Sequence, residues 1–369
     1  MGIIAKLLII LVLLPPMSYV SAADRNPLPY LMMVTFYANP ITKDNLTHVR
    51  RQMAPVFNQS AYDGIAVFPI DGRHRWDGSD FIWLTQTGIT KHIWPWVFIN
   101  RFCGYRHSAP RNKFWFQGIK GMDLYNETGA LQDFYNIFQN ALRVAKKMGS
   151  PGIVIDPELY NDYHCYNVAY VGEKQSKTSS EVVEALRAIG NTMADMVNQN
   201  HPNGTIWLFF APLHQEQPWT TTEIVIGMLN RAKNMGYNFK IVAGGSHTLG
   251  YCEPDLESLN SKIISRGKEF KTYLSEYPHI LKLGGTIAPW PNENLKKGWL
   301  LKGACGSSNL KGISDFAPLL GRLMRVYDYV WIYSDGATGY DPFNAVVAFP
   351  CDTVFRRVKE EEKARSLSE

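Results

Sequence analysis

The sequence predicts an α/β fold, a single (β/α)8 TIM barrel with long loops after its strands, and three observations lead to this fold. Eight short segments rich in β-branched and aromatic residues recur along the chain, each with the length of a buried strand. The intervals between them carry helical patterns of apolar residues. No GxGxxG or GxxxxGKS/T motif, typical of open nucleotide-binding sheets, occurs. The alternation of strand and helix therefore favours a closed barrel over a doubly wound open sheet.

The expected strands are nearly continuous apolar runs, as in parallel sheets that are buried on both faces. A helix over residues 314–326 is expected before the last of them. The strands are predicted over residues 30–37, 62–70, 92–100, 152–158, 205–211, 239–243, 279–288 and 328–334. Long loops at the mouth of the barrel are expected over residues 101–128, 159–177 and 289–311.

Two of the intervening helices have recognisable start signals. Thr178 with Glu181, and Thr220 with Glu223, have the spacing of a capping box. Each of these helices should therefore begin directly after its threonine. Glycines expected to end helices in the left-handed conformation stand at positions 149 and 236.

The composition is that of a globular protein. The chain has 369 residues, is 46% hydrophobic and 19% charged, and carries a formal net charge of +5. These values exclude a disordered chain, which combines low hydrophobicity with high net charge. So mild a charge gives little support to a nucleic-acid partner, and we expect none.

The first residues have the features of an export signal. Lys6 is the sole charge before an apolar run over residues 7–14, and Val20-Ser21-Ala22 supplies small residues for cleavage. We therefore expect a signal peptide over residues 1–22 and a barrel domain over residues 23–369. Because no second long apolar stretch follows, we expect a secreted or periplasmic monomer with no membrane span after cleavage.

The cysteines are expected to form disulfides in such an exported protein. Cys103, Cys165, Cys252 and Cys305 follow the third, fourth, sixth and seventh predicted strands. Neighbouring strands carry neighbouring loops, so we expect the pairs Cys103–Cys165 and Cys252–Cys305, with Cys351 left as a partly buried thiol. The sequence contains no CxxC, HxH or HExxH motif, and we expect neither a metal ion nor another cofactor.

Carboxylates stand at the ends of two predicted strands. Alternation along the fourth strand turns Ile153 and Ile155 toward the helices, and turns Asp156 and Glu158 toward the barrel axis. The same alternation on the eighth strand gives Asp335 the inward parity. A barrel interior keeps a carboxylate only with a partner or a function. A buried ion pair with an arginine such as Arg101 is the alternative for the fourth-strand acids, and a turn role is the alternative for Asp335.

The end of the fourth strand also carries a resemblance. The sequence GIVIDPELY, residues 152–160, looks like the corresponding segment of many (β/α)8 glycoside hydrolases. It is similar in shape to the DGxDxDxE signature of family 18 chitinases, with Glu158 at the position of the catalytic acid and Asp156 at the last aspartate. Pro151 and Val154 replace the first two aspartates, so family 18 is not assigned.

Glycoside hydrolysis requires carboxylic groups in pairs. One acid protonates the leaving oxygen, and a second carboxylate acts as nucleophile or activates water. A neighbouring carboxylate helps the acid to hold its proton by raising its pKa. We therefore predict Glu158 as general acid/base and Asp156 as its partner, with Asp335 across the barrel mouth. The choice of nucleophile stays open.

Aromatic and polar residues near the ends of the predicted strands complete the expected carbohydrate site, because sugar faces stack on aromatic rings and hydroxyl groups bind polar side chains. Asp71 is both a further acid candidate and a candidate for helix capping. The predicted substrate-binding residues are Asp71, Asn100, Arg101, Tyr160, His214, Trp219, His247, Trp290 and Trp331.

Two other classes of function stay open at this point. A catalytically inactive, carbohydrate-binding barrel would keep the aromatic residues without needing the acids. A different barrel enzyme, such as a lyase or a metal-dependent hydrolase, would use the same strand ends for other chemistry. Fold alone does not separate these classes.

Overall fold

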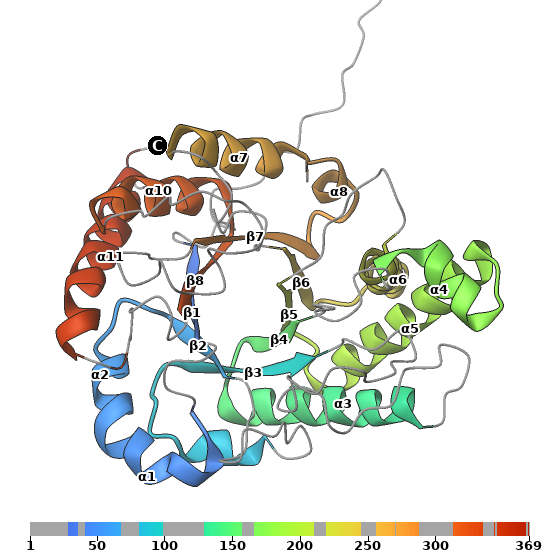
Figure 1. Cartoon of the computed structure of the whole chain (residues 1–369), viewed down its shortest axis with the longest axis horizontal. Helices are drawn as coiled ribbons and strands as arrows, with labels where there is room; N and C mark the ends of the chain where they lie inside the picture. Colours follow the sequence, from blue (N-terminus) through green and yellow to red (C-terminus); the bar gives the residue numbers. More distant parts are fainter. Residues whose placement is uncertain are drawn as a thin grey trace, which may run out of the picture.

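Eight parallel strands close into one barrel in sequence order in the computed structural model (Figure 1). The structure describes residues 29–35, 41–67, 81–98, 129–156, 166–209, 219–244, 256–269, 271–287, 313–334, 343, 345–366 and 368. The strands are β1 (Tyr30–Thr35), β2 (Gly64–Val67), β3 (His92–Phe98), β4 (Gly152–Asp156), β5 (Thr205–Leu208), β6 (Lys240–Ala243), β7 (Leu281–Ile287) and β8 (Tyr329–Ser334). The predicted TIM barrel is thus confirmed, with a strand within each predicted range.

Pairing between the first and the last strand closes the barrel. β1 and β8 pair in parallel over six positions, from Tyr30 opposite Tyr329 to Thr35 opposite Ser334. β3 and β4 pair with Trp96 opposite Val154 and Phe98 opposite Asp156. The register therefore places the inward-facing acid of β4 level with the end of β3.

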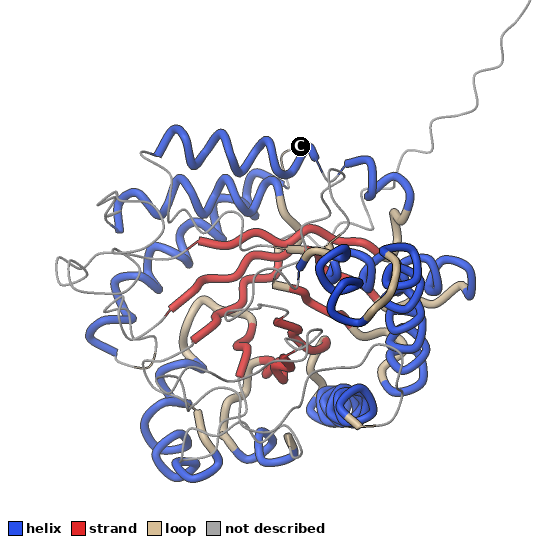
Figure 2. Tube along the Cα trace, turned by 45° about the vertical axis from the view of Figure 1, so that its right-hand side comes forward, coloured by secondary structure: helices blue, strands red, loops and turns tan. Residues whose placement is uncertain are grey.

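Helices surround the strands on the outside, as the tube in Figure 2 shows. The β2–β3 connection differs from the predicted repeat, because its described part, residues 81–91, contains a 3-10 helix and no α-helix. The helical elements are η2 (Lys43–Asn45), α1 (Leu46–His48), the π-helical η3 (Val49–Met53), α2 (Ala54–Asn58), the 3-10 helix η4 (Ile82–Gln86), α3 (Ala130–Met148), α4 (Val168–Gln175), α5 (Ser179–Asn200), α6 (Thr220–Met235), α7 (Leu256–Glu269), α8 (Lys271–Glu276), α10 (Ile313–Val326) and α11 (Ala345–Ser366).

One of the two predicted capping boxes is present. The Glu181 amide donates to the Thr178 hydroxyl oxygen over 3.2 Å, and the Thr178 amide donates to the Glu181 carboxylate over 2.9 Å. These bonds satisfy two amide groups at the start of α5. Gly149 and Gly236 end α3 and α6 with φ angles of 68° and 65°, as predicted.

The prediction of a second capping box, at Thr220 and Glu223, is wrong. α6 begins at Thr220, with Trp219 as its N-cap residue and no side-chain cap. Thr220 is already helical, so its hydroxyl cannot take the capping role of the residue before a helix. Glu223 instead forms an ion pair with Arg187 of α5, with 2.7 Å between Glu223 Oε2 and Arg187 Nε.

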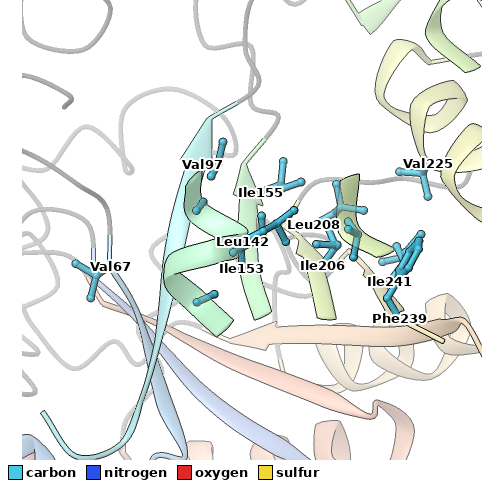
Figure 3. Close-up of a cluster of buried hydrophobic side chains, with 14 of the residues drawn as sticks. Val67, Val97, Leu142, Ile153, Ile155, Ile206, Leu208, Val225, Phe239 and Ile241 are labelled. Carbon is cyan, nitrogen blue, oxygen red and sulfur yellow. The ribbon is translucent and has the colours of Figure 1, made fainter. Parts of the chain in front are cut away.

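The main apolar core lies between the strands and the surrounding helices. Ile153 and Ile155 of β4 belong to it, together with Leu142 of α3 and Val97 of β3, and Figure 3 shows these side chains in one cluster. The outward parity predicted for the two isoleucines is therefore confirmed. Val330 and Ile332 of β8 belong to the same core.

No helix in the described ranges is long and apolar enough to cross a membrane. The predicted signal peptide lies outside the described residues. The same holds for the first four cysteines, and for the side chain of Cys351 within α11. The cleavage site, the domain limits and the disulfide pairs stay predictions.

Candidate active site at the carboxyl end of the barrel

β4 carries an acid into the interior of the barrel. Ile153 and Ile155 face the outer core, so the alternation of side chains turns Val154 and Asp156 inward. Both inward side chains are buried, and Asp156 is only 1% exposed. The interior position predicted for Asp156 is thus confirmed.

Gly152 allows β4 to lie close to its neighbour. A Cβ atom at this position would overlap the carbonyl oxygen of Thr205 on β5. Further along the pair, the amide of Phe209 donates to the Ile155 carbonyl oxygen over 3.1 Å. This bond brings Phe209, directly after β5, to the level of the last residues of β4.

An aromatic layer fills the barrel interior near this acid. The rings of Phe209 and Trp331 stack, with centroids 4.5 Å apart and planes inclined by 21°. Trp96 meets the same Phe209 ring edge to face, with centroids 5.1 Å apart. Such contacts stabilise a pair by about 0.5–1.5 kcal/mol beyond the burial of its surface.

Trp331 was predicted to bind substrate, and the structure places it within this aromatic layer. The side chain is 3% exposed, and that of Trp96 is 1% exposed. Both residues therefore belong to this packed aromatic layer beneath the barrel mouth, which is called the aromatic floor below. Phe209 was not singled out in the sequence, although it has the same inward parity as Trp207.

A second aromatic layer fills the opposite, amino end of the barrel. Trp207 packs edge to face on Trp94 and Tyr329, with centroid distances of 5.9 and 5.2 Å. Tyr30 lies beside Tyr329 and receives a hydrogen bond of 2.9 Å from Trp94 Nε1. Burial raises the pKa of the Tyr30 and Tyr329 hydroxyl groups, so both stay neutral.

Trp219, another predicted substrate-binding residue, lies where α6 begins. Its side chain is half-buried, and its ring lies 5.0 Å from that of Tyr166, at an angle of 32°. Tyr166 directly precedes Asn167, the N-cap residue of α4. The helices of such a barrel begin at the carboxyl end of the strands, so this pair lies on the face where β4 ends with Asp156.

The structure does not describe the remaining predicted site residues. Their convergence on one site stays a prediction, and so does the placement of residues 101–128 and 289–311 as loops over the mouth. The loop predicted over residues 159–177 contains a helix, α4. The site residues outside the described ranges are Glu158, Asp335, Asp71, Asn100, Arg101, Tyr160, His214, His247 and Trp290.

Among the described residues, no group of three or more histidine, cysteine, aspartate or glutamate side chains is placed to hold a metal ion. In the part of the barrel mouth that the structure describes, the candidate site consists of the buried Asp156 carboxyl group and the aromatic rings beneath and beside it.

No protein-family model and no curated protein matches the sequence. Solved structures with barrel folds do match. The catalytic domain of beta-amylase from Paenibacillus polymyxa is 8% identical with a TM-score of 0.46, and the match covers 89% of this chain and 98% of that one. Family 18 chitinase from Crocus vernus is 10% identical with a TM-score of 0.38, covering 92% and 100%.

Matching structures are not confined to glycoside hydrolases. A putative dihydrodipicolinate synthetase from Pseudomonas aeruginosa is 11% identical with a TM-score of 0.37, over 90% of this chain and 82% of that one. All three TM-scores are below 0.5, so the functional proposal rests on the residues of this chain.

Proposed function

We propose that this protein is a secreted glycoside hydrolase that cleaves an oligo- or polysaccharide by carboxylate general acid/base catalysis. The observation that carries the proposal is Asp156, a carboxyl group with 1% of its surface exposed at the inward-facing end of β4. A carboxyl group inside a barrel has a polar partner, a function or both, and we propose a function for Asp156. The carboxyl end of barrel strands is where such enzymes hold their catalytic groups.

Glu158 is the acid in this proposal. It follows Asp156 by two residues, and strand alternation predicts the same inward parity for it. The burial of Asp156 favours a role in which it acts on its neighbour. In this proposal, a negative charge on Asp156 raises the pKa of the Glu158 carboxyl group and so favours its protonated form.

The proposed reaction consumes one water molecule and includes two proton transfers. Glu158 donates its proton to the glycosidic oxygen as the bond to the anomeric carbon breaks. The second carboxylate, for which Asp335 and Asp156 are the candidates, either attacks the anomeric carbon or removes a proton from the attacking water. Water supplies the new hydroxyl group at the anomeric carbon. After attack by the carboxylate, the water displaces that carboxylate from the anomeric carbon and gives its proton to Glu158. After direct attack by water, the second carboxylate takes the proton, and exchange with solvent restores both groups.

A panel assay of new reducing ends on polysaccharides tests the proposal. We expect Glu158→Gln to lose activity by a factor on the order of 10²–10⁴, because the amide cannot donate the proton, while its circular dichroism spectrum stays that of the wild type. Asp156→Asn and Asp335→Asn should also lose activity. Wild-type turnover by Glu158→Gln would refute the assignment, and inhibition by a chelator would favour a metal-dependent enzyme.

A further inference from the structure

Tyr166 and Trp219 form an aromatic pair, here called the rim pair, that joins two consecutive connections of the barrel. Tyr166 ends the β4–α4 connection and Trp219 ends the β5–α6 connection. Their ring centroids lie 5.0 Å apart, and both side chains are half-buried. The two rings thus pack on each other, and each residue keeps part of its surface in contact with solvent.

The backbone holds the rim pair in place. Asn167 and Trp219 form an isolated antiparallel β-bridge, which links the two connections directly in front of their helices. The Asn167 side-chain oxygen accepts hydrogen bonds from the amides of Ala169 and Tyr170, over 2.8 and 3.3 Å, and so starts α4. The Trp219 carbonyl oxygen accepts a bond of 3.0 Å from the Glu223 amide and starts α6.

The helix behind Trp219 is itself firmly anchored. The ion pair between Glu223 and Arg187 ties the first turn of α6 to α5. At Gly227 of α6, a Cβ atom would lie 2.8 Å from the Arg187 Cα atom, so the two helices approach closely at this level. The rim pair therefore stands on rigid elements, which suits a surface that binds a ligand in a defined orientation.

We propose that the rim pair is a stacking subsite that binds a sugar ring of an extended oligosaccharide beside the site of cleavage. This inference rests on the proposed function and adds a substrate class to it. The substrate would be an oligosaccharide long enough to extend from the end of β4 to the rim pair. The apolar C–H face of a pyranose ring packs on an aromatic ring, and partly exposed tyrosine and tryptophan combine an apolar face with a polar atom.

Kinetics on short and long substrates test this subsite. For Trp219→Ala we expect KM on a long oligosaccharide to rise about 10-fold to 100-fold, as for the loss of one buried aromatic contact, with kcat unchanged. On an aryl monosaccharide glycoside, which does not reach the rim, KM should be unchanged. Tyr166→Ala should have a smaller effect in the same direction, and Trp219→Phe should retain KM within about 5-fold.

Met235→Ala is the matched control, because Met235 is 50% exposed at the far end of the same helix. It should change neither kinetic constant. Equal losses on short and long substrates, or a fall in kcat alone, would show that Trp219 serves the fold or the reaction and would refute the subsite. An unchanged KM on the long substrate would refute it too.

Retardation in native gels that contain polysaccharide separates this inference from the proposed function. The Glu158→Gln variant should be retarded, and the double variant with Trp219→Ala should run as it does without polysaccharide. If the wild type cleaves nothing but shows Trp219-dependent retardation, the proposed function fails and the subsite stands. If it cleaves with no dependence on Trp219, the subsite fails. If it neither cleaves nor binds any polymer, both fail.

Discussion

Hydrogen bonds at the amino end of the barrel connect His92 to two aromatic residues. Trp94 Nε1 donates to the Tyr30 hydroxyl oxygen over 2.9 Å. The Tyr30 hydroxyl group also forms a hydrogen bond of 3.1 Å with His92 Nδ1, and Tyr30 is the donor when His92 carries its proton on Nε2. The His92 ring stacks on the Tyr30 ring, with centroids 5.9 Å apart.

This arrangement makes the stability of the protein depend on pH. Desolvation lowers the pKa of His92, followed by an opposing effect of the Asp63 charge, and Lys91 adds to the lowering. Since the unfolded state binds the proton more readily, the free energy of unfolding should fall as the pH drops below about 6.5, the ordinary histidine pKa. The fall should be small, because His92 is exposed. Urea unfolding midpoints measured between pH 7.5 and pH 5 should show this decline.

His92→Asn should make the decline smaller. The asparagine side-chain oxygen stands near the position of Nδ1 and still accepts the Tyr30 proton, but it does not titrate. His48→Gln changes an exposed histidine of α1 and should leave the decline as in the wild type. An equal pH dependence in His92→Asn and the wild type would contradict the role assigned to His92.

At the scale of elements, the sequence predicted strands better than helix starts. In a strand such as β4, the alternation of the strand's own residues determines which side chains face inward. The inward placement of Asp156 could therefore be predicted from Ile153 and Ile155. The start of α6 depends on contacts with other elements. Neither the β-bridge between Trp219 and Asn167 nor the ion pair of Glu223 with α5 can be predicted from the residues around the start of α6.

The same distinction applies to the candidate site. Phe209 directly follows β5, and Trp331 belongs to β8, which is not a neighbour of β5 in the barrel. The stacking of their rings depends on the relative stagger of these strands. Parity alone predicts that Trp331 points inward and does not predict which ring covers it. The contacts within the aromatic floor therefore became known only from the three-dimensional structure, whereas the inward position of Asp156 could be predicted from the sequence.

Close packing of α5 on α6 depends on glycine. A Cβ atom at Gly190 would overlap the Ile224 carbonyl oxygen and lie 2.9 Å from the Met228 amide nitrogen. Gly190→Ala should separate the two helices and lower the free energy of unfolding by about 1–3 kcal/mol, despite the better helix propensity of alanine. Asn191→Ala, at the next and exposed position, should change it by less than about 0.5 kcal/mol. Denaturant unfolding would measure both, and equal stability of the two variants would contradict this account.

At the scale of the whole molecule, the last helix secures the closure of the barrel. α11 lies beside α10 on the outside of the barrel (Figure 1). It contacts the segment before β2, from the opposite end of the sequence. Lys359 Nζ lies 2.8 Å from Asp63 Oδ1 and donates to the Ala61 carbonyl oxygen over 3.0 Å. The Asp352 carboxylate accepts a bond from the Ala61 amide.

Apolar packing accompanies these polar contacts and should contribute more to stability. Phe355 of α11 is fully buried, and its ring meets that of Tyr62 edge to face, with centroids 5.7 Å apart. Lys359 and Asp63 are 19% and 35% exposed, so solvent screens their attraction and the pair contributes modestly. The contribution of α11 to the closure of the barrel therefore comes chiefly from its apolar face.

Substitutions on the two faces of α11 test this conclusion. Phe355→Ala should lower the free energy of unfolding by about 3–5 kcal/mol, because it leaves a cavity between α11 and the segment that leads into β2. Arg357→Ala removes an exposed side chain 3.7 Å from Glu361 and should cost less than about 0.5 kcal/mol. Guanidinium unfolding of both variants, followed by circular dichroism, measures the difference. Similar midpoints would show that the barrel closes without α11, and that the pairing of β1 with β8 alone holds the two ends of the chain together.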